Sequence, residues 1–323
     1  MKISPICLGT AFFGKTIFEA EGIKIINHAI DAGINFVDTA DIYGNGEAER
    51  IVGKALQGRR KDVVIGTKVF GPTGDGPNNA GLSRRHILDA VEKSLERLGT
   101  DYIDLYMLHD PDYFSPIEET LRTLDSLIKD GKIRYIGCCN FYAWLLMESL
   151  AISERLNLER IVSTQPLYNI VNRDIELELL PLCQKYGIGV TSYAPIARGV
   201  LTAKYRSGEK PPLESRVGKG DKRVFETEWR EESFRVAEKI KELAGSRGMT
   251  ASQFALAWVL ANPGITSSII GPRNVEQLAD NLGALDFSIT TDDEKKVDEL
   301  VPPGEHTGKG YINPDYPVRG RMH

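Results

Sequence analysis

The feature that most constrains the fold is a regular alternation of short apolar runs with longer amphipathic stretches along almost the whole chain. The apolar runs have the length of buried strands, and the intervening stretches carry apolar residues at helical spacing. Eight strands with helices between them predict a (β/α)8 barrel. We expect the strands at Ile6–Leu8, Asn35–Asp38, Val63–Lys68, Ile103–His109, Ile133–Gly137, Ile161–Gln165, Gly189–Tyr193 and Ser267–Ile270.

The same pattern predicts an extra C-terminal helix, Thr291–Leu300, followed by a tail to His323. No Gly/Ser-rich linker divides the chain, so we expect residues 1–323 to form a single barrel domain. Two segments rich in turn residues, Gly71–Gly81 and Ser207–Trp229, could be binding loops or surface insertions. The other predicted helices are Ala20–Ala32, Ser83–Leu98, Pro116–Lys129, Tyr142–Arg155, Ile175–Tyr186, Glu231–Gly245, Ala251–Leu260 and Val275–Leu282.

Composition argues against several classes of function. The net charge of −5 is spread over interspersed acids and bases, which argues against a nucleic-acid or membrane surface. No apolar run approaches the roughly 20 residues needed to span a bilayer, and the N-terminus lacks a signal-peptide pattern. The four cysteines form no disulfide framework in a chain of 323 residues. We therefore expect reduced thiols and a cytoplasmic protein.

Four residues with distinct chemistry, Asp38, Tyr43, Lys68 and His109, lie at or just past the ends of predicted strands. In a parallel barrel the carboxyl ends of the strands converge on one face, where active sites form. Alone, each has an ordinary explanation, such as a surface tyrosine, a structural Asp–Lys pair or a capping histidine. Together, a carboxylate, a phenol, an ammonium and an imidazole in one pocket predict proton transfer to or from an oxygen.

Read together, several segments along nearly the whole chain resemble the aldo-keto reductase family. The resemblance is to the branch of the family that also contains the potassium-channel β subunits. Each motif is weak alone, and their order at strand ends makes the set specific. The motifs are Asn35-Phe-Val-Asp-Thr-Ala-Asp-Ile-Tyr-Gly44, Gly66-Thr-Lys-Val69, Leu108-His109, Gly131-Lys-Ile-Arg-Tyr-Ile-Gly-Cys-Cys-Asn-Phe141, Gln165-Pro-Leu-Tyr-Asn169, Tyr193-Ala-Pro-Ile-Ala-Arg-Gly199 and the segment Gly271–Leu285.

The resemblance implies an NADPH-dependent oxidoreductase that interconverts a carbonyl (aldehyde, ketone or sugar) and an alcohol by hydride transfer from nicotinamide C4. Tyr43 would be the proton donor. A free phenol titrates at about 10, and the Lys68 ammonium would lower that pKa. Asp38 would pair with Lys68, and His109 would orient the substrate oxygen.

The resemblance also implies where the cofactor binds. Asn140 and Gln165 would hold the carboxamide, and Tyr193 would stack on the nicotinamide. Arg273 at the start of a helix suits a 2′-phosphate, so we expect NADPH, with NADH as the alternative. The remaining expected contacts are Arg198, Gly199, Leu201 and Lys204 at the pyrophosphate, Arg216 as a clasp, and Gly271, Gln277, Asp280 and Asn281 toward the adenine end.

The chain departs from the family pattern in three places. Cys139 and Ala194 stand where many relatives have hydroxyl-bearing residues, so the cofactor should be held more loosely. The first strand begins almost at Met1, which leaves no room for the N-terminal hairpin that closes the barrel floor in many relatives. Either the barrel floor is open, or another segment covers it, or the start of the sequence is truncated.

For the substrate pocket we expect Phe13 and Asp110.

Two other functions remain open. A cofactor-binding regulatory subunit is the main alternative, although the channel β subunits typically lack the histidine found here at position 109. A barrel hydrolase with paired carboxylates would leave Tyr43 and Lys68 without a role. We expect no metal, because Lys68 would repel a cation. The expected partner is a small carbonyl or alcohol substrate, and the expected assembly is a monomer or small homo-oligomer.

Overall fold

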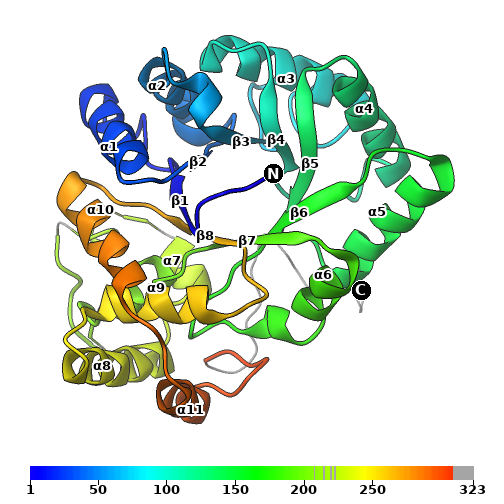
Figure 1. Ribbon diagram of the computed structural model, residues 1–323. Helices are drawn as coiled ribbons and strands as arrows, with labels where there is room; N and C mark the ends of the chain where they lie inside the picture. The colour runs from blue at the N-terminus through cyan, green and yellow to red at the C-terminus, as the bar shows by residue number, and fades with distance from the viewer. Residues whose placement is uncertain (207, 214, 219, 222, 308–323) are drawn as a thin grey trace.

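The chain folds into a closed barrel of eight parallel strands in the order β1 to β8, with β8 pairing back onto β1 (Figure 1). This computed structural model describes residues 1–307 except 207, 214, 219 and 222, so the tail to His323 lies mostly outside it. The (β/α)8 prediction is confirmed. The strands are Ile6–Gly9 (β1), Phe36–Asp38 (β2), Val64–Val69 (β3), Ile103–Leu108 (β4), Ile133–Cys139 (β5), Ile161–Gln165 (β6), Gly189–Tyr193 (β7) and Ser267–Ile270 (β8).

Helices surround the barrel, and the extra C-terminal helix is α11 (Figure 1). Two helices were not predicted from the sequence. They are α2, which follows the turn after Tyr43, and the short α7 in the long segment after β7. The helices are Glu19–Asp31 (α1), Glu47–Ala55 (α2), Arg84–Leu98 (α3), Ile117–Lys129 (α4), Ala143–Leu156 (α5), Leu179–Tyr186 (α6), Arg223–Thr227 (α7), Glu231–Ser246 (α8), Ala251–Ala261 (α9), Val275–Leu282 (α10) and Thr291–Leu300 (α11).

Local signals in the sequence account for several helix ends. Ser83 caps α3 by accepting a hydrogen bond from the backbone N–H of His86, as its position predicts. Thr250 and Gln253 form a capping box at the start of α9. Gly99 ends α3 in a left-handed conformation with a φ of 62°, which glycine adopts without steric cost.

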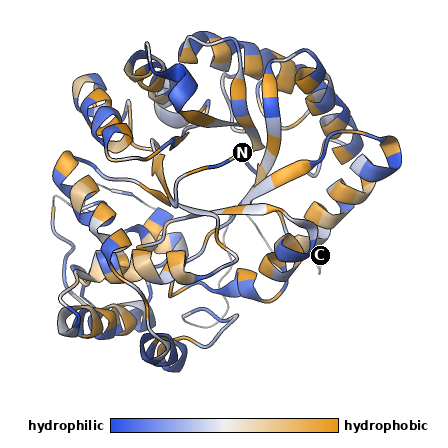
Figure 2. Ribbon diagram, in the orientation of Figure 1, coloured by the Kyte–Doolittle hydropathy of each residue, from blue (hydrophilic) through white to orange (hydrophobic). Residues whose placement is uncertain are grey.

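Side chains alternate between the inside of the barrel and the helical shell. A small cluster of Cys7, Phe36, Leu105, Met107 and Cys139 fills the barrel, while a much larger apolar cluster lies between the strands and the helices. Figure 2 shows hydrophobic and hydrophilic residues interspersed along the helices that surround the barrel. No helix among the described residues is long and apolar enough to cross a membrane.

The floor of the barrel is covered by the segment that precedes β1. Ile3 packs against the apolar cluster inside the barrel, and this segment runs across the barrel end in Figure 1. Ser4 and Asn35 exchange hydrogen bonds through the Ser4 N–H (2.6 Å) and the Asn35 N–H (3.1 Å). The first residues of the chain therefore lie over this end of the barrel.

Candidate active site

Strand alternation directs the predicted catalytic residues into the mouth of the barrel. Asp38 lies two residues beyond Phe36, and His109 lies two residues beyond Met107, both of which point inward. A Cβ built on Gly66 would touch Phe36 and Met107, so position 66 also faces inward and Lys68 follows it. All three side chains therefore meet at the carboxyl end of neighbouring strands, as expected.

Asp38 and Lys68 form a buried ion pair at the base of the mouth. The Lys68 Nζ lies 2.5 Å from Asp38 Oδ1 and donates to the Thr39 carbonyl at 2.8 Å. Gln165 Nε2 donates to the other carboxylate oxygen of Asp38 at 2.8 Å. Burial alone would lower the pKa of Lys68, but the charge of Asp38, those of Tyr43 and Cys139 and the hydrogen bond to Asp38 together outweigh burial and raise it. The ammonium is therefore kept charged.

Tyr43 and His109 lie above this ion pair. Their rings meet edge to face with centroids 5.7 Å apart, and Lys68 Nζ lies 5.0 Å from the centre of the Tyr43 ring. Burial raises the pKa of Tyr43 to about 12, although the Lys68 charge opposes this rise. In the protein alone, the expected lowering by Lys68 is therefore present but smaller than the effect of burial. Burial and the charges of Lys68 and Arg223 lower the pKa of His109 well below its usual value, so its ring is neutral.

The turn that carries Tyr43 depends on glycine. Residues 44–46 all have positive φ, with values of 57° at Gly44, 56° at Asn45 and 90° at Gly46. A Cβ on Gly44 would lie 2.6 Å from the Phe13 carbonyl oxygen, so no other residue fits there without movement. The close approach fixes where Tyr43 enters the mouth.

The residues expected near the nicotinamide lie together on the β5, β6 and β7 side of the mouth. Asn140 donates to Asp110 Oδ1 at 3.0 Å and accepts from the Tyr193 hydroxyl at 3.0 Å. Gln165 is joined to Asp38, so it links this side to the ion pair. Cys139 is buried inside the barrel, and Ala194 has a positive φ of 56°.

A group of cationic side chains gathers where the phosphates are expected. Burial and the charges of Arg273 and Arg216 lower the pKa of Lys204, and burial and Arg198 lower the pKa of Arg216. Arg198 pairs with the buried Glu228, and Arg216 pairs with Asp221. Lys204 has no acidic partner among the described residues. This donor set fits a polyanion such as a dinucleotide phosphate.

The turn beside these cations is tightly built. Arg198 and Gly199 both have positive φ, and a Cβ on Gly199 would lie 2.8 Å from Lys204 Nζ. Leu201 of the same turn is fully buried and supports the turn from within the core. Arg216 lies over the Phe12 ring at 4.6 Å, which joins the long segment after β7 to the loop after β1 across the mouth.

The residues expected at the adenine end lie on or just before α10. Gly271 faces open space, and the Arg273 N–H donates to Gln277 Oε1 at 3.0 Å. The Asp280 carboxylate accepts a hydrogen bond from Thr250 at 3.1 Å, which gives it a structural contact with α9. Asn281 is buried on the same helix.

Of the residues expected at the substrate pocket, Asp110 lies at the mouth next to Asn140. Phe13 is only 1% exposed, and its ring packs against Gly22 of α1. The neighbouring Phe12, which has Arg216 over its ring, is therefore better placed at the mouth than Phe13.

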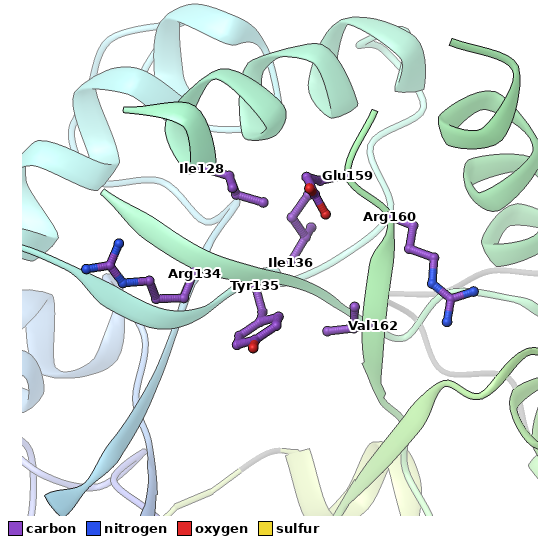
Figure 3. Close-up of a pocket in the computed structure, with 7 residues that line it drawn as sticks. All are labelled: Ile128, Arg134, Tyr135, Ile136, Glu159, Arg160 and Val162. Atoms are coloured by element: carbon purple, nitrogen blue, oxygen red, sulfur yellow. The ribbon is translucent and has the colours of Figure 1, made fainter. Parts of the chain in front are cut away.

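The structure also has a pocket of about 400 Å³ on the β5 and β6 strands beside α4 (Figure 3). It contains none of the predicted site residues. Its two arginines are engaged, since Arg134 lies 4.6 Å from the centre of the Tyr102 ring and Arg160 donates to the Tyr186 carbonyl. No group of three or more metal-ligating side chains occurs in the described part of the chain. The mouth of the barrel therefore remains the candidate site.

Sequence reasoning missed a buried polar group directly behind this site. Glu49 and Asp41 are almost completely buried, and Arg97 pairs with Glu49. Burial, reinforced by the Glu49 charge, raises the pKa of Asp41 to about 8. The only available signal was the helix that follows Tyr43, because Glu49 falls on its inner face.

Comparison with known proteins agrees with this architecture. The family model described as "Aldo/keto reductase family" matches residues 5–302. A probable voltage-gated potassium channel subunit beta from Oryza sativa subsp. japonica is 36% identical over 308 residues, covering 93% of this chain and 94% of the rice protein. An uncharacterized oxidoreductase from Bacillus subtilis (strain 168) is 37% identical, covering 96% of both chains.

A third relative, described as a versiconal hemiacetal acetate reductase from Aspergillus parasiticus, is 32% identical over 336 residues and covers 96% of this chain and 97% of its own. The family match covers nearly the whole barrel that carries the residues described above. The chain therefore belongs to the aldo/keto reductase family.

Proposed function

We propose that this protein is an NADPH-dependent oxidoreductase that reduces an aldehyde, ketone or sugar carbonyl to an alcohol. The observation that carries the proposal is the meeting of Asp38, Lys68, Tyr43 and His109 in one mouth beside a cationic group. The oxidoreductase and reductase among the relatives support the same class of reaction.

Each residue has a role that follows from its state. Tyr43 carries its proton at neutral pH, since its pKa lies at about 12, so the proton is available for the carbonyl oxygen. Lys68 stabilises the phenolate left behind, and Asp38 keeps Lys68 charged and in place. The neutral His109 can donate a hydrogen bond to the same oxygen and orient the substrate.

The cofactor would lie across the mouth from Arg273 to Tyr193. Arg198, Lys204 and Arg216 would hold its phosphates, and Arg273 would favour a 2′-phosphate and hence NADPH over NADH. Asn140 and Gln165 would hold the carboxamide. When bound, NADPH supplies the hydride from nicotinamide C4.

A regulatory, cofactor-binding subunit is the second candidate. It is favoured by the 36% identity to a protein described as a potassium channel subunit beta. The two candidates differ in turnover, because a sensor subunit binds the cofactor and reduces carbonyls slowly. His109 beside Tyr43 favours the enzyme.

The deciding experiment measures NADPH consumption by the purified protein with a reactive aromatic aldehyde, comparing wild type with Tyr43→Phe. We expect turnover in wild type and a loss of about a thousandfold in the variant, with NADPH binding retained. Tyr135→Phe, an exposed tyrosine on β5, is the matched control. Tight NADPH binding without turnover would favour the regulatory subunit, and no binding would refute both candidates.

A further inference from the structure

The turn that carries Tyr43 is held from behind by one buried glutamate. Glu49 lies in the first turn of α2, three residues after the turn ends, and is 0% exposed. Its Oε1 accepts a hydrogen bond from Thr67 Oγ1 at 2.6 Å. Its Oε2 accepts from Arg97 Nε at 2.7 Å, and a second guanidinium nitrogen lies at the same distance.

These contacts join three elements around the catalytic residues. Thr67 precedes Lys68 on β3, and because strand neighbours face opposite sides, Lys68 points into the mouth while Thr67 points into the helical shell. Arg97 comes from α3, and its side chain packs on the Tyr43 turn, since a Cβ on Gly46 would lie 2.7 Å from Arg97 Cδ. Glu49 therefore connects the strand of Lys68 to the turn of Tyr43.

The contacts are costly to build, which indicates a specific role. A fully buried carboxylate is retained only when hydrogen bonds and an opposite charge compensate its lost hydration. Here both oxygens are engaged, and the Arg97 side chain is only 13% exposed. α2 and α3 also approach closely, because a Cβ on Gly53 would lie 2.5 Å from the Leu98 carbonyl oxygen.

We propose that the Glu49–Arg97 pair is a positioning element that fixes the turn carrying Tyr43 relative to the strand carrying Lys68. This rests on the proposed function for its catalytic readout. The pair does not touch the reacting atoms, and it acts through the placement of the Tyr43 hydroxyl.

The test compares Glu49→Gln with Glu47→Gln, a half-exposed glutamate of the same helix turn that pairs with Arg50. We expect Glu49→Gln to lower kcat about tenfold to a hundredfold, since small displacements at a reacting centre carry large penalties. The KM and the Kd for NADPH should stay within about twofold of wild type. Thr67→Val removes a single hydrogen bond at constant size and should give a smaller loss of kcat. This variant replaces Glu49→Gln in the test if Glu49→Gln does not fold.

The route through Tyr43 is tested in a Tyr43→Phe background. There the Glu49→Gln penalty should shrink to less than about twofold, because the group it positions is gone. An equal penalty in both backgrounds, or a folded Glu49→Gln protein with unchanged kcat, would overturn the inference.

A measurement without substrate separates this inference from the proposed function. The Tyr43 N–H donates to the Ala40 carbonyl at 3.1 Å and the Asn45 N–H donates to the Ile42 carbonyl at 3.2 Å. Hydrogen exchange at these two amides should quicken about tenfold in Glu49→Gln and not in Glu47→Gln. Unchanged exchange would overturn the inference even if wild type proved inactive, whereas an inactive wild type with faster exchange would refute only the proposed function.

Discussion

The two sides of the barrel mouth treat charge in opposite ways. On the β2 to β4 side, Lys68 is paired with Asp38. The ammonium of Lys68 and both carboxylate oxygens of Asp38 are hydrogen-bonded. On the β7 and β8 side, burial and the charges of Arg273 and Arg216 lower the pKa of Lys204, which has no acidic partner among the described residues, while Arg216 itself pairs with Asp221. A matched pair controls a proton at a fixed place, whereas an excess of one sign attracts a ligand of the other. The two sides of the mouth therefore differ in how their charges are compensated.

Removing the charge on the matched side should have the largest effect. Lys68→Met would abolish the support for the Tyr43 phenolate and leave Asp38 buried without its partner. We expect kcat to fall by about a thousandfold and stability to fall by about 3–5 kcal/mol. Steady-state kinetics and denaturant unfolding, with the exposed Lys61→Met as control, would measure both. A stable, active variant would show that the pair is dispensable.

Removing the charge of Arg273 on the β7 and β8 side should change cofactor choice and leave the chemistry intact. Arg273→Met would lose charge-assisted hydrogen bonds to a 2′-phosphate, so we expect NADPH affinity to fall about 10- to 100-fold. NADH affinity should stay nearly constant. Fluorescence titration with NADPH and NADH would measure the two affinities. An equal loss of affinity for both cofactors would mean that the 2′-phosphate binds elsewhere.

Lys204→Met should sharpen the comparison further. Its ammonium has a lowered pKa because burial and neighbouring cations disfavour the charge. The variant should therefore unfold at the same or a higher temperature without nucleotide, while affinity for both cofactors falls about tenfold. The affinity should also depend less steeply on salt. Destabilisation of the nucleotide-free protein would argue against an excess of positive charge there.

The smallest effect, a change in stability, is expected at Asp41. This buried acid lies on the β2 to β4 side and has no basic partner of its own among the described residues. Burial and the Glu49 charge raise the pKa of its carboxyl group from 3.8 to about 8, against the opposing charges of Arg97 and Lys68. The unfolded chain loses this proton near pH 4 and the folded chain keeps it to about pH 8, so stability falls as pH rises between these values. Asp41→Asn should raise the Tm by a few degrees at pH 7 and by nothing at pH 4.

Thermal melts of wild type and Asp41→Asn across this pH range would measure the difference. A gain of equal size at both pH values would mean that the asparagine stabilises through packing, with no contribution from the proton.

The strands could be predicted almost to the residue, because their apolar runs end where polar catalytic side chains begin. β6, β7 and β8 have the predicted bounds, and the other strands differ by one or two residues at an end. Helix α2 was missed because Gly44, Gly46 and Gly53 obscure its pattern, although two of these glycines shape the Tyr43 turn and the third admits α3.

The candidate catalytic side chains could be named from the sequence, but their environment could not. The raised pKa of Tyr43 reflects burial, which depends on the packing of segments far apart in the chain. The bond from Gln165 to Asp38 spans 127 residues, and the contact of Arg97 with Glu49 spans 48. No local pattern predicts such pairs, because they follow from the closure of the barrel.

One consequence concerns how the specificity of this protein could be redesigned. Thr67 and Lys68 are neighbours on β3, yet Lys68 faces Asp38 in the mouth of the barrel and Thr67 faces Glu49 in the outer shell. A library that randomises only the loops around the mouth would leave this support untouched. Variation in α2 and α3, more than one layer from any bound molecule, should then yield activity changes that a search confined to the pocket would miss.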